Sequence, residues 1–260
     1  MASFSEPGPP GTPAAVGLDA SLDAAGLNVA AVLSRERYDA LVPHAWQSRA
    51  LLPGATSVFV IGSGGPAFYW AARRARPDAQ HPLDEFLEEM VTRAASKLER
   101  AGCVTRAVFY WERRGENDRE PGRFADFIAL ARAAGLGASS RLGLLIHPTF
   151  GPWFAIRALL LSEFPSPDST ATDAQFDPCA SCSAPCVEAC PGAAVGRGRF
   201  SAERCAATRE ELTQCAQRCD ARLACPIGVD YRYDLEALAY HMTSQFRGAA
   251  PKSISRGARR

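Results

Sequence analysis

Eight of the nine cysteines of this 260-residue chain fall between residues 179 and 225, and no other feature constrains the fold as strongly. Two blocks each end in a cysteine followed by proline: CASCSAPCVEACP at 179–191 and CAQRCDARLACP at 215–226. The N-terminal residues lack the basic flank and apolar run of a secretory signal, so we expect a cytoplasmic protein. Because cytosolic thiols stay reduced, this density of cysteines predicts metal ligation and not disulfide bonds.

The spacing of these cysteines is typical of iron–sulfur clusters. In the bacterial ferredoxin run, the last cysteine, which precedes proline, binds the other cluster. Proline favours this crossing because its fixed φ stops the chain from continuing as a helix toward its own cluster. We therefore predict two 4Fe–4S clusters. The first would be bound by Cys179, Cys182, Cys186 and Cys225, and the second by Cys190, Cys205, Cys215 and Cys219.

A pair of four-thiolate zinc sites is the alternative for the same cysteines. Zinc ribbons usually carry two C-x-x-C pairs, whereas this stretch has one, formed by Cys179 and Cys182. The ninth cysteine, Cys103, follows a glycine at the end of a predicted helix, and we expect it to be a small buried residue.

The remaining sequence predicts an α/β (α+β) domain over residues 15–163, because strand and helix patterns alternate there. An amphipathic stripe predicts a helix at 82–100, and the turn residues HPTFGP would join strands at 142–146 and 153–161 into a hairpin. The other predicted segments are a flexible leader at 1–14, a proline-rich linker at 164–178, a small ferredoxin-like domain at 179–230 and a C-terminal tail at 231–260.

The overall charge is close to neutral, with 29 basic and 28 acidic residues and a net charge of +1. This balance gives no reason to expect nucleic acid or a membrane surface as a partner. No apolar run approaches the roughly 18 residues of a membrane-spanning helix. We therefore expect a binder of small molecules, with no nucleic acid and no membrane among its partners.

A second chemistry-bearing stretch, IHPTFGPWFAIR, occupies residues 146–157. Its prolines and glycine form a rigid turn, and its aromatic side chains offer flat apolar area that suits a wide conjugated cofactor. Arg157 lies in an otherwise apolar strand and would need an anionic or carbonyl partner if buried. The alternative for His147 is a histidine that only packs in the core.

The glycines after the predicted strand Ser57–Ile61 raise a further possibility. Gly62, Gly64 and Ala67 satisfy the G-x-G-x-x-A dinucleotide fingerprint. The acidic residue expected some twenty positions later falls inside the predicted helix at 82–100, so the Rossmann context fails. We expect instead a backbone loop at Gly62 and Gly64 that approaches the cofactor.

Three segments, LLPGATSVFVIGSGGPAFYW, HPLDEFLEEMVTRAASKL and IHPTFGPWFAIRALLL, resemble in the same order a family of cobalamin-processing proteins. Loss of the animal member causes methylmalonic aciduria with homocystinuria type C. The resemblance implies a flavin-nitroreductase-like domain that binds cobalamin and removes its upper axial ligand; whether FMN shares the cavity is left open. It implies a corrin pocket lined by His147, Phe150, Gly151, Trp153, Phe154 and Arg157, with His147 as the catalytic residue.

The cysteine blocks stand where the animal proteins have glutathione-binding segments, so we expect electrons to replace the thiol. The main prediction is a bacterial form fused to a two-cluster module: a cobalamin-binding oxidoreductase that removes the upper ligand and traffics the cofactor. Its electrons would come from a donor such as ferredoxin or flavodoxin reductase.

Two alternatives remain for the function. The segment AGLGASSRLGLLI with a two-cluster module also resembles epoxyqueuosine reductases and reductive dehalogenases, which act on a separate organic substrate. Asp118 is the nearest candidate for the acid of the queuosine enzymes. The other alternative is a plain electron-transfer protein whose first domain has lost its cofactor.

Overall fold

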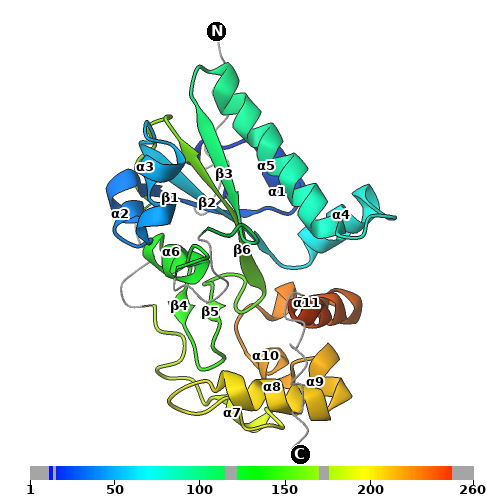
Figure 1. The fold of residues 1–260 in the computed structure, drawn as a ribbon. Helices are drawn as coiled ribbons and strands as arrows, with labels where there is room; N and C mark the ends of the chain where they lie inside the picture. The colour runs from blue at the N-terminus through cyan, green and yellow to red at the C-terminus, as the bar shows by residue number, and fades with distance from the viewer. Residues whose placement is uncertain (1–11, 14–15, 115–121, 170–175, 248–260) are drawn as a thin grey trace, which may run out of the picture.

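The computed structural model describes residues 12–13, 16–114, 122–169 and 176–247 (Figure 1). Its centre is a four-stranded sheet in the order β1-β2-β6-β3, in which every neighbouring pair is antiparallel. The mixed α/β class is therefore confirmed, with an antiparallel sheet. The strands are β1 (Val29–Ser34), β2 (Ser57–Gly64), β3 (Thr105–Phe109) and β6 (Phe154–Ser162).

Both faces of the sheet are covered by helices, as Figure 1 shows. One face carries α1 (Ser21–Ala24), α4 (Ala67–Ala75), α5 (Pro82–Arg100) and α11 (Leu235–Arg247). The other face carries α2 (Arg35–Asp39), η2 (His44–Trp46), α3 (Ser48–Leu51) and α6 (Phe127–Ala133). Since β1, β2 and β6 are buried on both sides, their apolar residues form continuous runs instead of alternating with polar ones.

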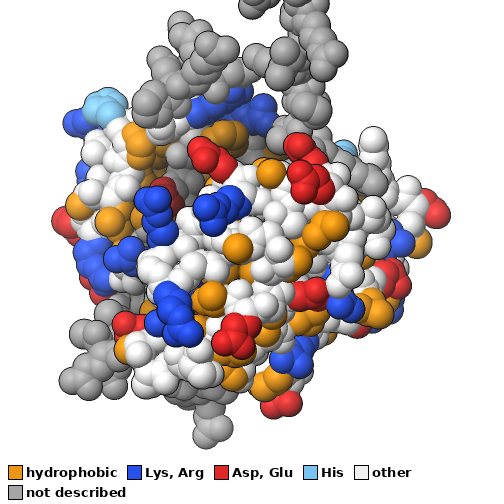
Figure 2. All heavy atoms as spheres, turned by 90° about the horizontal axis from the view of Figure 1, so that it is seen from below, with side chains coloured by type: hydrophobic (Ala, Val, Ile, Leu, Met, Phe, Trp, Pro, Cys, Tyr) orange, Lys and Arg blue, Asp and Glu red, His pale blue; other side chains and the backbone are white. Residues whose placement is uncertain are grey.

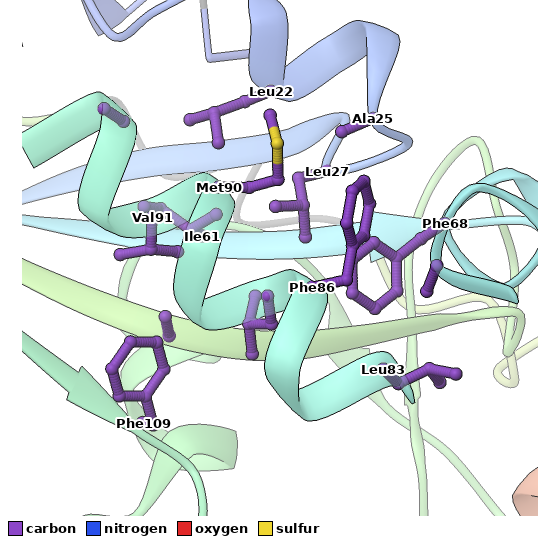
Figure 3. Packing of buried hydrophobic residues seen from close by; sticks show 14 of the residues in the cluster. Leu22, Ala25, Leu27, Ile61, Phe68, Leu83, Phe86, Met90, Val91 and Phe109 are labelled. Atoms are coloured by element: carbon purple, nitrogen blue, oxygen red, sulfur yellow. The ribbon is translucent and has the colours of Figure 1, made fainter. Parts of the chain in front are cut away.

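The predicted helix at 82–100 is confirmed as α5. Pro82 occupies its first turn, where a missing N–H costs nothing, and acidic residues follow it at the positive end of the helix dipole. Its stripe packs on the sheet beside α1 and α4, where Figure 3 shows Met90 next to Leu22 and Phe86 next to Phe68. The rings of Phe68 and Phe86 are 5.9 Å apart.

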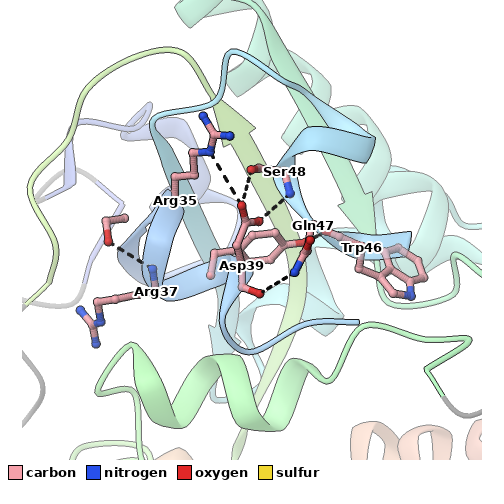
Figure 4. Close-up of polar contacts among 8 residues, drawn as sticks. Arg35, Arg37, Asp39, Trp46, Gln47 and Ser48 are labelled. Carbon is pink, nitrogen blue, oxygen red and sulfur yellow. Dashed lines mark hydrogen bonds and ion pairs between the residues drawn. The ribbon is translucent and has the colours of Figure 1, made fainter. Parts of the chain in front are cut away.

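A polar network joins α2 to α3 on the opposite face (Figure 4). The carboxylate of Asp39 accepts hydrogen bonds from the backbone N–H and the hydroxyl of Ser48, at 2.6 and 2.7 Å. The hydroxyl of Tyr38 donates to the carbonyl of Trp46 at 2.7 Å. These bonds satisfy buried polar groups and fix the loop that covers this side of the sheet.

The predicted hairpin between residues 142–146 and 153–161 is wrong. β5 (Leu145–Ile146) pairs with the short strand β4 (Ala138–Ser139) in a second small sheet. β6 instead lies between β2 and β3 at the centre of the main sheet. The apolar run of β6 is buried on both faces, and such a strand finds partners on both edges, which local sequence does not identify.

The predicted loop at Gly62 and Gly64 is also wrong, because β2 continues through Gly64. The pairing shifts between Ile61 and Gly62: Ile61 faces Ala158, whereas Gly62 faces Ile156. Arg157 is the extra residue of this β-bulge, a feature that re-aims side chains.

The cysteine-rich segment consists of short helices below the main sheet in Figure 1. Within the described residues its only strand-like pairing is a single bridge between Val195 and Phe200, so a ferredoxin-like domain is not confirmed. The helices are α7 (Pro185–Glu188), α8 (Ala202–Glu211), α9 (Thr213–Gln217), α10 (Asp220–Leu223) and η3 (Val229–Tyr231).

The segment predicted as a C-terminal tail differs from that prediction over its described part. Residues 235–247 form α11, and buried Ala237 and Leu238 join the core beneath α4 and α5. The amphipathic spacing of LEALAYHM explains this packing. No helix in the described ranges is long and apolar enough to cross a membrane.

Candidate functional site

The first predicted cysteine set surrounds one small cavity. Its wall contains the thiols of Cys179, Cys182, Cys186 and Cys225 together with Ile146 and other apolar residues. Ile146 belongs to β5, so the cavity lies between the cysteine-rich segment and the sheet domain. Arg141 also lines it, and its Nη1 donates to the carbonyl of Cys179 at 2.7 Å.

The second predicted set surrounds another cavity, lined by Cys190, Cys205, Cys215 and Cys219. This wall is closed on one side by Met242 of α11 and on another by Gly192. A Cβ on Gly192 would lie 1.8 Å from the Thr208 hydroxyl oxygen, so only glycine fits between the chain and α8 here.

Burial raises the pKa of five of these thiols, and neighbouring thiols of the same set raise it further. Cys225 is affected by Cys179, Cys182 and Cys186. Cys215 is affected by Cys190 and Cys205. The thiols with a raised pKa are Cys186, Cys205, Cys215, Cys219 and Cys225. Four thiolates held close together repel one another, and a positively charged metal centre between them relieves this repulsion. Each set is therefore suited to a metal-containing group.

Within the described ranges no three His, Cys, Asp or Glu side chains meet closely enough to hold one metal ion. The two cavities, each with four thiols in its wall, are therefore the feature that supports a metal-containing group. Helix α10 connects them, since Cys219 precedes it and Cys225 follows it by two residues.

Residues 147–152 form a turn, called here the aromatic turn, that directly follows Ile146 in the wall of the first cavity. The backbone N–H and carbonyl of His147 each bond to Gly151, at 2.9 Å, which closes the turn. Its Nδ1 accepts from the backbone N–H groups of Thr149 and Phe150 at 3.1 and 3.3 Å. Burial lowers the pKa of His147 to about 4, so the imidazole is neutral near pH 7 with its proton assigned to Nε2.

The tip of this turn is covered by the segment that follows Cys225. Gly151 has φ +59°, and a Cβ there would lie 2.1 Å from the carbonyl oxygen of Ile227. Gly228, with φ +70°, approaches the Phe150 backbone as closely. Two glycines thus allow two backbones to touch, and the Phe150 ring meets Tyr231 edge-on at 4.7 Å. The turn is the docking point of the cysteine-rich segment.

The structure divides the six predicted pocket residues between the two faces of the sheet. His147, Phe150 and Phe154 lie together, with the His147 ring 5.0 and 5.3 Å from the two phenylalanine rings. Trp153 belongs to the opposite core and is 0% exposed. Arg157 points to that same side, where its Nε donates to the Ser63 hydroxyl at 3.0 Å and its guanidinium lies over the Phe68 ring. Its expected anionic or carbonyl partner is replaced by a hydroxyl and a ring.

The two predicted glycines are packing positions in the sheet. A Cβ on Gly64 would lie 2.3 Å from the Phe150 ring, and one on Gly62 would lie 2.8 Å from the carbonyl oxygen of Ala155. Gly64 therefore lets Phe150 lie flat on β2, and neither glycine forms the expected loop. Asp118, the candidate acid, lies outside the described residues.

Sequence reasoning missed Arg222 and Tyr233. Arg222 of α10 lies between the cysteine-rich segment and the sheet domain, and its guanidinium is 4.5 Å from the centre of the Trp153 ring and 5.0 Å from that of Tyr233. A basic residue inside the cysteine block, three positions before Cys225, was the available signal.

Comparison with known proteins gives no match to a protein-family model. The chain is 37% identical over 78 residues to the epoxyqueuosine reductase of Staphylococcus aureus, and 33% identical over 87 residues to that of Listeria monocytogenes. The matches cover 30% and 33% of this chain but 19% and 21% of the relatives, so the chain spans about a fifth of the curated relatives it matches.

Solved structures share the fold. Epoxyqueuosine reductase from Streptococcus thermophilus is 14% identical, with a TM-score of 0.52 over 80% of this chain and 64% of that chain. The C. elegans B12-trafficking protein CblC is 12% identical, with a TM-score of 0.51 over 82% of this chain and 84% of that chain. The resemblance to the cobalamin-processing family is thus supported at the level of the fold, while the sequence matches are to epoxyqueuosine reductases.

The expectation that excluded nucleic acid as a partner is wrong. An epoxyqueuosine reductase of this fold, with a TM-score of 0.53, has been solved with an epoxyqueuosine-modified tRNA stem loop. Net charge was a poor guide because it averages over the surface. Figure 2, which views the molecule from the end with the cysteine-rich segment, shows Lys and Arg side chains gathered mostly on one side of that face.

Proposed function

We propose that this chain is a cobalamin-dependent iron–sulfur reductase of the epoxyqueuosine reductase type, acting on an organic substrate separate from the cofactor. The observation that carries the proposal is the pair of cavities, each lined by four thiols, beneath a sheet domain of the epoxyqueuosine reductase fold. Sequence identity to two epoxyqueuosine reductases supports it.

The thiol-lined cavities fit iron–sulfur clusters chemically. Each has four sulfur donors and otherwise mainly apolar walls, which limit access of water to a bound cluster. The first cluster would be bound by Cys179, Cys182, Cys186 and Cys225, and the second by Cys190, Cys205, Cys215 and Cys219. When bound, the clusters would supply single electrons, and cobalamin would supply a cobalt centre that passes them on.

The residues around the aromatic turn fit cobalamin in part. His147, Phe150 and Phe154 are partly exposed on one side of β6 and would contact the corrin. Gly151 and Trp153 are buried under other parts of the chain, so we assign them to docking the cysteine-rich segment instead. His147 is neutral near pH 7 and would hold its proton on Nε2, on the side away from the two backbone donors. It would orient the cofactor by hydrogen bonding.

Removal of the upper ligand of cobalamin itself is the second candidate function. It is favoured by the coverage of the B12-trafficking protein CblC, of which the chain spans 84%, compared with 64% of the Streptococcus thermophilus reductase. Either function uses the same two cavities and the same aromatic turn, so the substrate is what separates them.

The deciding experiment uses the full chain, purified without oxygen and reconstituted with iron and sulfide. We expect uptake of roughly eight irons per chain, a change in the absorption spectrum of added cobalamin, and conversion of an epoxyqueuosine-containing tRNA stem loop under reducing conditions. Loss of cyanide from cyanocobalamin without conversion of the stem loop would favour the second candidate. Iron uptake without any response to cobalamin would contradict both.

A further inference from the structure

A hollow of about 210 Å³ lies against the second thiol cavity, at the junction of α8 and α9. We call it the outer hollow. It shares Pro191, Cys215 and Asp220 with the wall of that cavity. Its other walls are exposed residues, so it opens to solvent beside one of the four cysteines that would bind the second cluster. These residues are Glu211, Leu212, Thr213 and Gln214.

A large apolar side chain lies at the rim of the outer hollow. Leu212 is the cap residue that joins α8 to α9, and it is 44% exposed. Contact surfaces between proteins commonly have an apolar centre inside a polar rim. The position of Leu212 beside the outer hollow matches such a centre.

The rim around Leu212 is negatively charged. Glu210 and Glu211 are the last residues of α8, both are exposed, and neither takes part in the ion pairs of the described residues. Arg209 in the same turn lines the second cavity instead and donates to the Met242 carbonyl. The carbonyl end of a helix carries partial negative charge, which disfavours acidic residues there. The stability of α8 therefore does not explain this charge, which is available to a partner.

The charged residue in the wall of the first cavity has the opposite sign. It is Arg141, and this cavity leads to the aromatic turn through Ile146. In the outer hollow, Asp220 pairs with Arg218 at 2.7 Å, so among the described residues Glu211 is the acid of its wall without a paired cation. A positively charged partner would therefore be attracted to the second cavity and repelled from the first.

We propose that the outer hollow and its rim are the docking surface of a one-electron carrier protein whose redox centre is surrounded by basic residues. The inference rests on the clusters of the proposed function and adds the place where their electrons enter. The carrier would lose one electron and the second cluster would gain it. The second cluster would then pass one electron to the first, across α10, which lies between Cys219 and Cys225.

The test measures how fast the reconstituted chain exchanges electrons with cytochrome c, a carrier protein whose haem edge is surrounded by lysines. The chain is first reduced without oxygen. Each cytochrome c then accepts one electron, which is followed by absorbance in a stopped-flow instrument. The electrons flow in reverse of the proposed direction, but docking depends on the surface and not on this direction. Ferricyanide, an anion that also accepts one electron, is the comparison.

Two double variants change the rim. Glu210→Gln with Glu211→Gln removes its charge, and Glu210→Lys with Glu211→Lys reverses it. Both suit the carbonyl end of a helix, so the iron content should stay at the wild-type value. The matched control is Glu188→Gln with Glu203→Gln, because these acids are exposed and line neither the thiol cavities nor the outer hollow.

We expect the neutral rim to slow oxidation by cytochrome c by roughly fivefold at low ionic strength, and the reversed rim to slow it by more than roughly tenfold. Oxidation by ferricyanide should become faster in the same variants, and the control should match the wild type with both probes. About 0.5 M salt should remove most of these differences, since it screens exposed charges. Cys182→Ala, which keeps the second set of thiols, should react with cytochrome c faster than Cys215→Ala.

The outcomes separate this inference from the proposed function. If the wild-type chain takes up no iron, the cluster assignment fails and the inference fails with it. If two clusters form and cytochrome c reacts with both rim variants at the wild-type rate, the inference alone is overturned. Faster reaction of Cys215→Ala than of Cys182→Ala would also overturn it, because electrons would then pass at the first cavity. The expected rates without conversion of the stem loop would contradict the proposed substrate and support the docking surface.

Discussion

His147 makes the folded protein sensitive to acid. Its pKa is lowered to about 4 by burial, and its Nδ1 accepts two backbone hydrogen bonds that a proton would break. An unfolded histidine binds a proton below about pH 6.5. Between these two values the unfolded chain holds a proton that the folded chain lacks, so stability falls as pH drops through this window.

We expect His147→Asn to reduce this acid sensitivity in the cluster-free chain, because asparagine keeps an acceptor near Nδ1 but does not titrate. The difference in unfolding free energy between pH 7 and pH 4.5 should shrink by on the order of 2 kcal/mol, allowing for partial exposure of the ring. Urea unfolding at both pH values measures it. Exposed His81→Asn is the control, and identical profiles for the two variants would contradict the assignment.

Substitution of Gly151 tests whether the cysteine-rich segment docks on the aromatic turn. Alanine at this position would be strained at φ +59° and would also meet the Ile227 carbonyl oxygen at 2.1 Å. Gly151→Ala should therefore destabilise the chain by more than about 2 kcal/mol. Gly102→Ala separates the two causes, since Gly102 has φ +90° but nothing within 4 Å. Equal losses of unfolding free energy in the two variants would mean that the backbones do not press together.

At the scale of elements, the sequence predicts what depends on local pattern. The stripe of α5 follows from its own spacing, and the buried strand in β2 follows from its β-branched residues. Strand order does not, because β6 pairs with β2 and β3 across long separations. Phe154 and Arg157 are an odd number of positions apart on β6, so the alternation of side chains along the strand puts them on opposite faces of the sheet, and a pocket predicted from adjacency in sequence is split.

The cysteine sets show the same contrast at the candidate site. The proline rule placed Cys225 with the first block, and the structure brings these four thiols to one cavity. That grouping was accessible because short spacings and a following proline are local signals. The contact of Arg222 with the Pro152 carbonyl was not accessible, since the two residues lie seventy positions apart in the chain.

Helix α11 is the element whose packing the sequence analysis missed, and its contribution to stability is measurable. Leu238 is 0% exposed in the core below α4 and α5, whereas Leu235 on the same helix is 72% exposed. Leu238→Ala should lower the unfolding free energy by about 2 to 5 kcal/mol, and Leu235→Ala by less than about 0.5 kcal/mol. Similar small changes in both variants, measured by thermal or urea unfolding, would mean that α11 does not dock.

At the scale of the whole molecule, the sheet domain and the cysteine-rich segment form a continuous structure. α11 closes the second cavity through Met242 and fills the core of the sheet domain through Leu238. β5 lines the first cavity through Ile146 and leads directly into the aromatic turn. Each thiol cavity therefore has walls from both the sheet domain and the cysteine-rich segment. Loss of a bound group at either cavity should lower the stability of the sheet domain as well as that of the cysteine-rich segment.

The division of the cysteines into two sets predicts which cluster each substitution removes. Cys182→Ala should abolish the cluster at the first cavity, Cys215→Ala the one at the second, and each variant should retain roughly half of the wild-type iron and sulfide. Cys103→Ala, which alters neither cavity, should retain all of it. Because metal binding contributes folding free energy, the melting temperature of each cavity variant should also fall. Iron analysis and thermal unfolding of the reconstituted chain measure both effects. Loss of all iron in either single variant would contradict two independent sites, and full retention in both would exclude these cysteines as ligands.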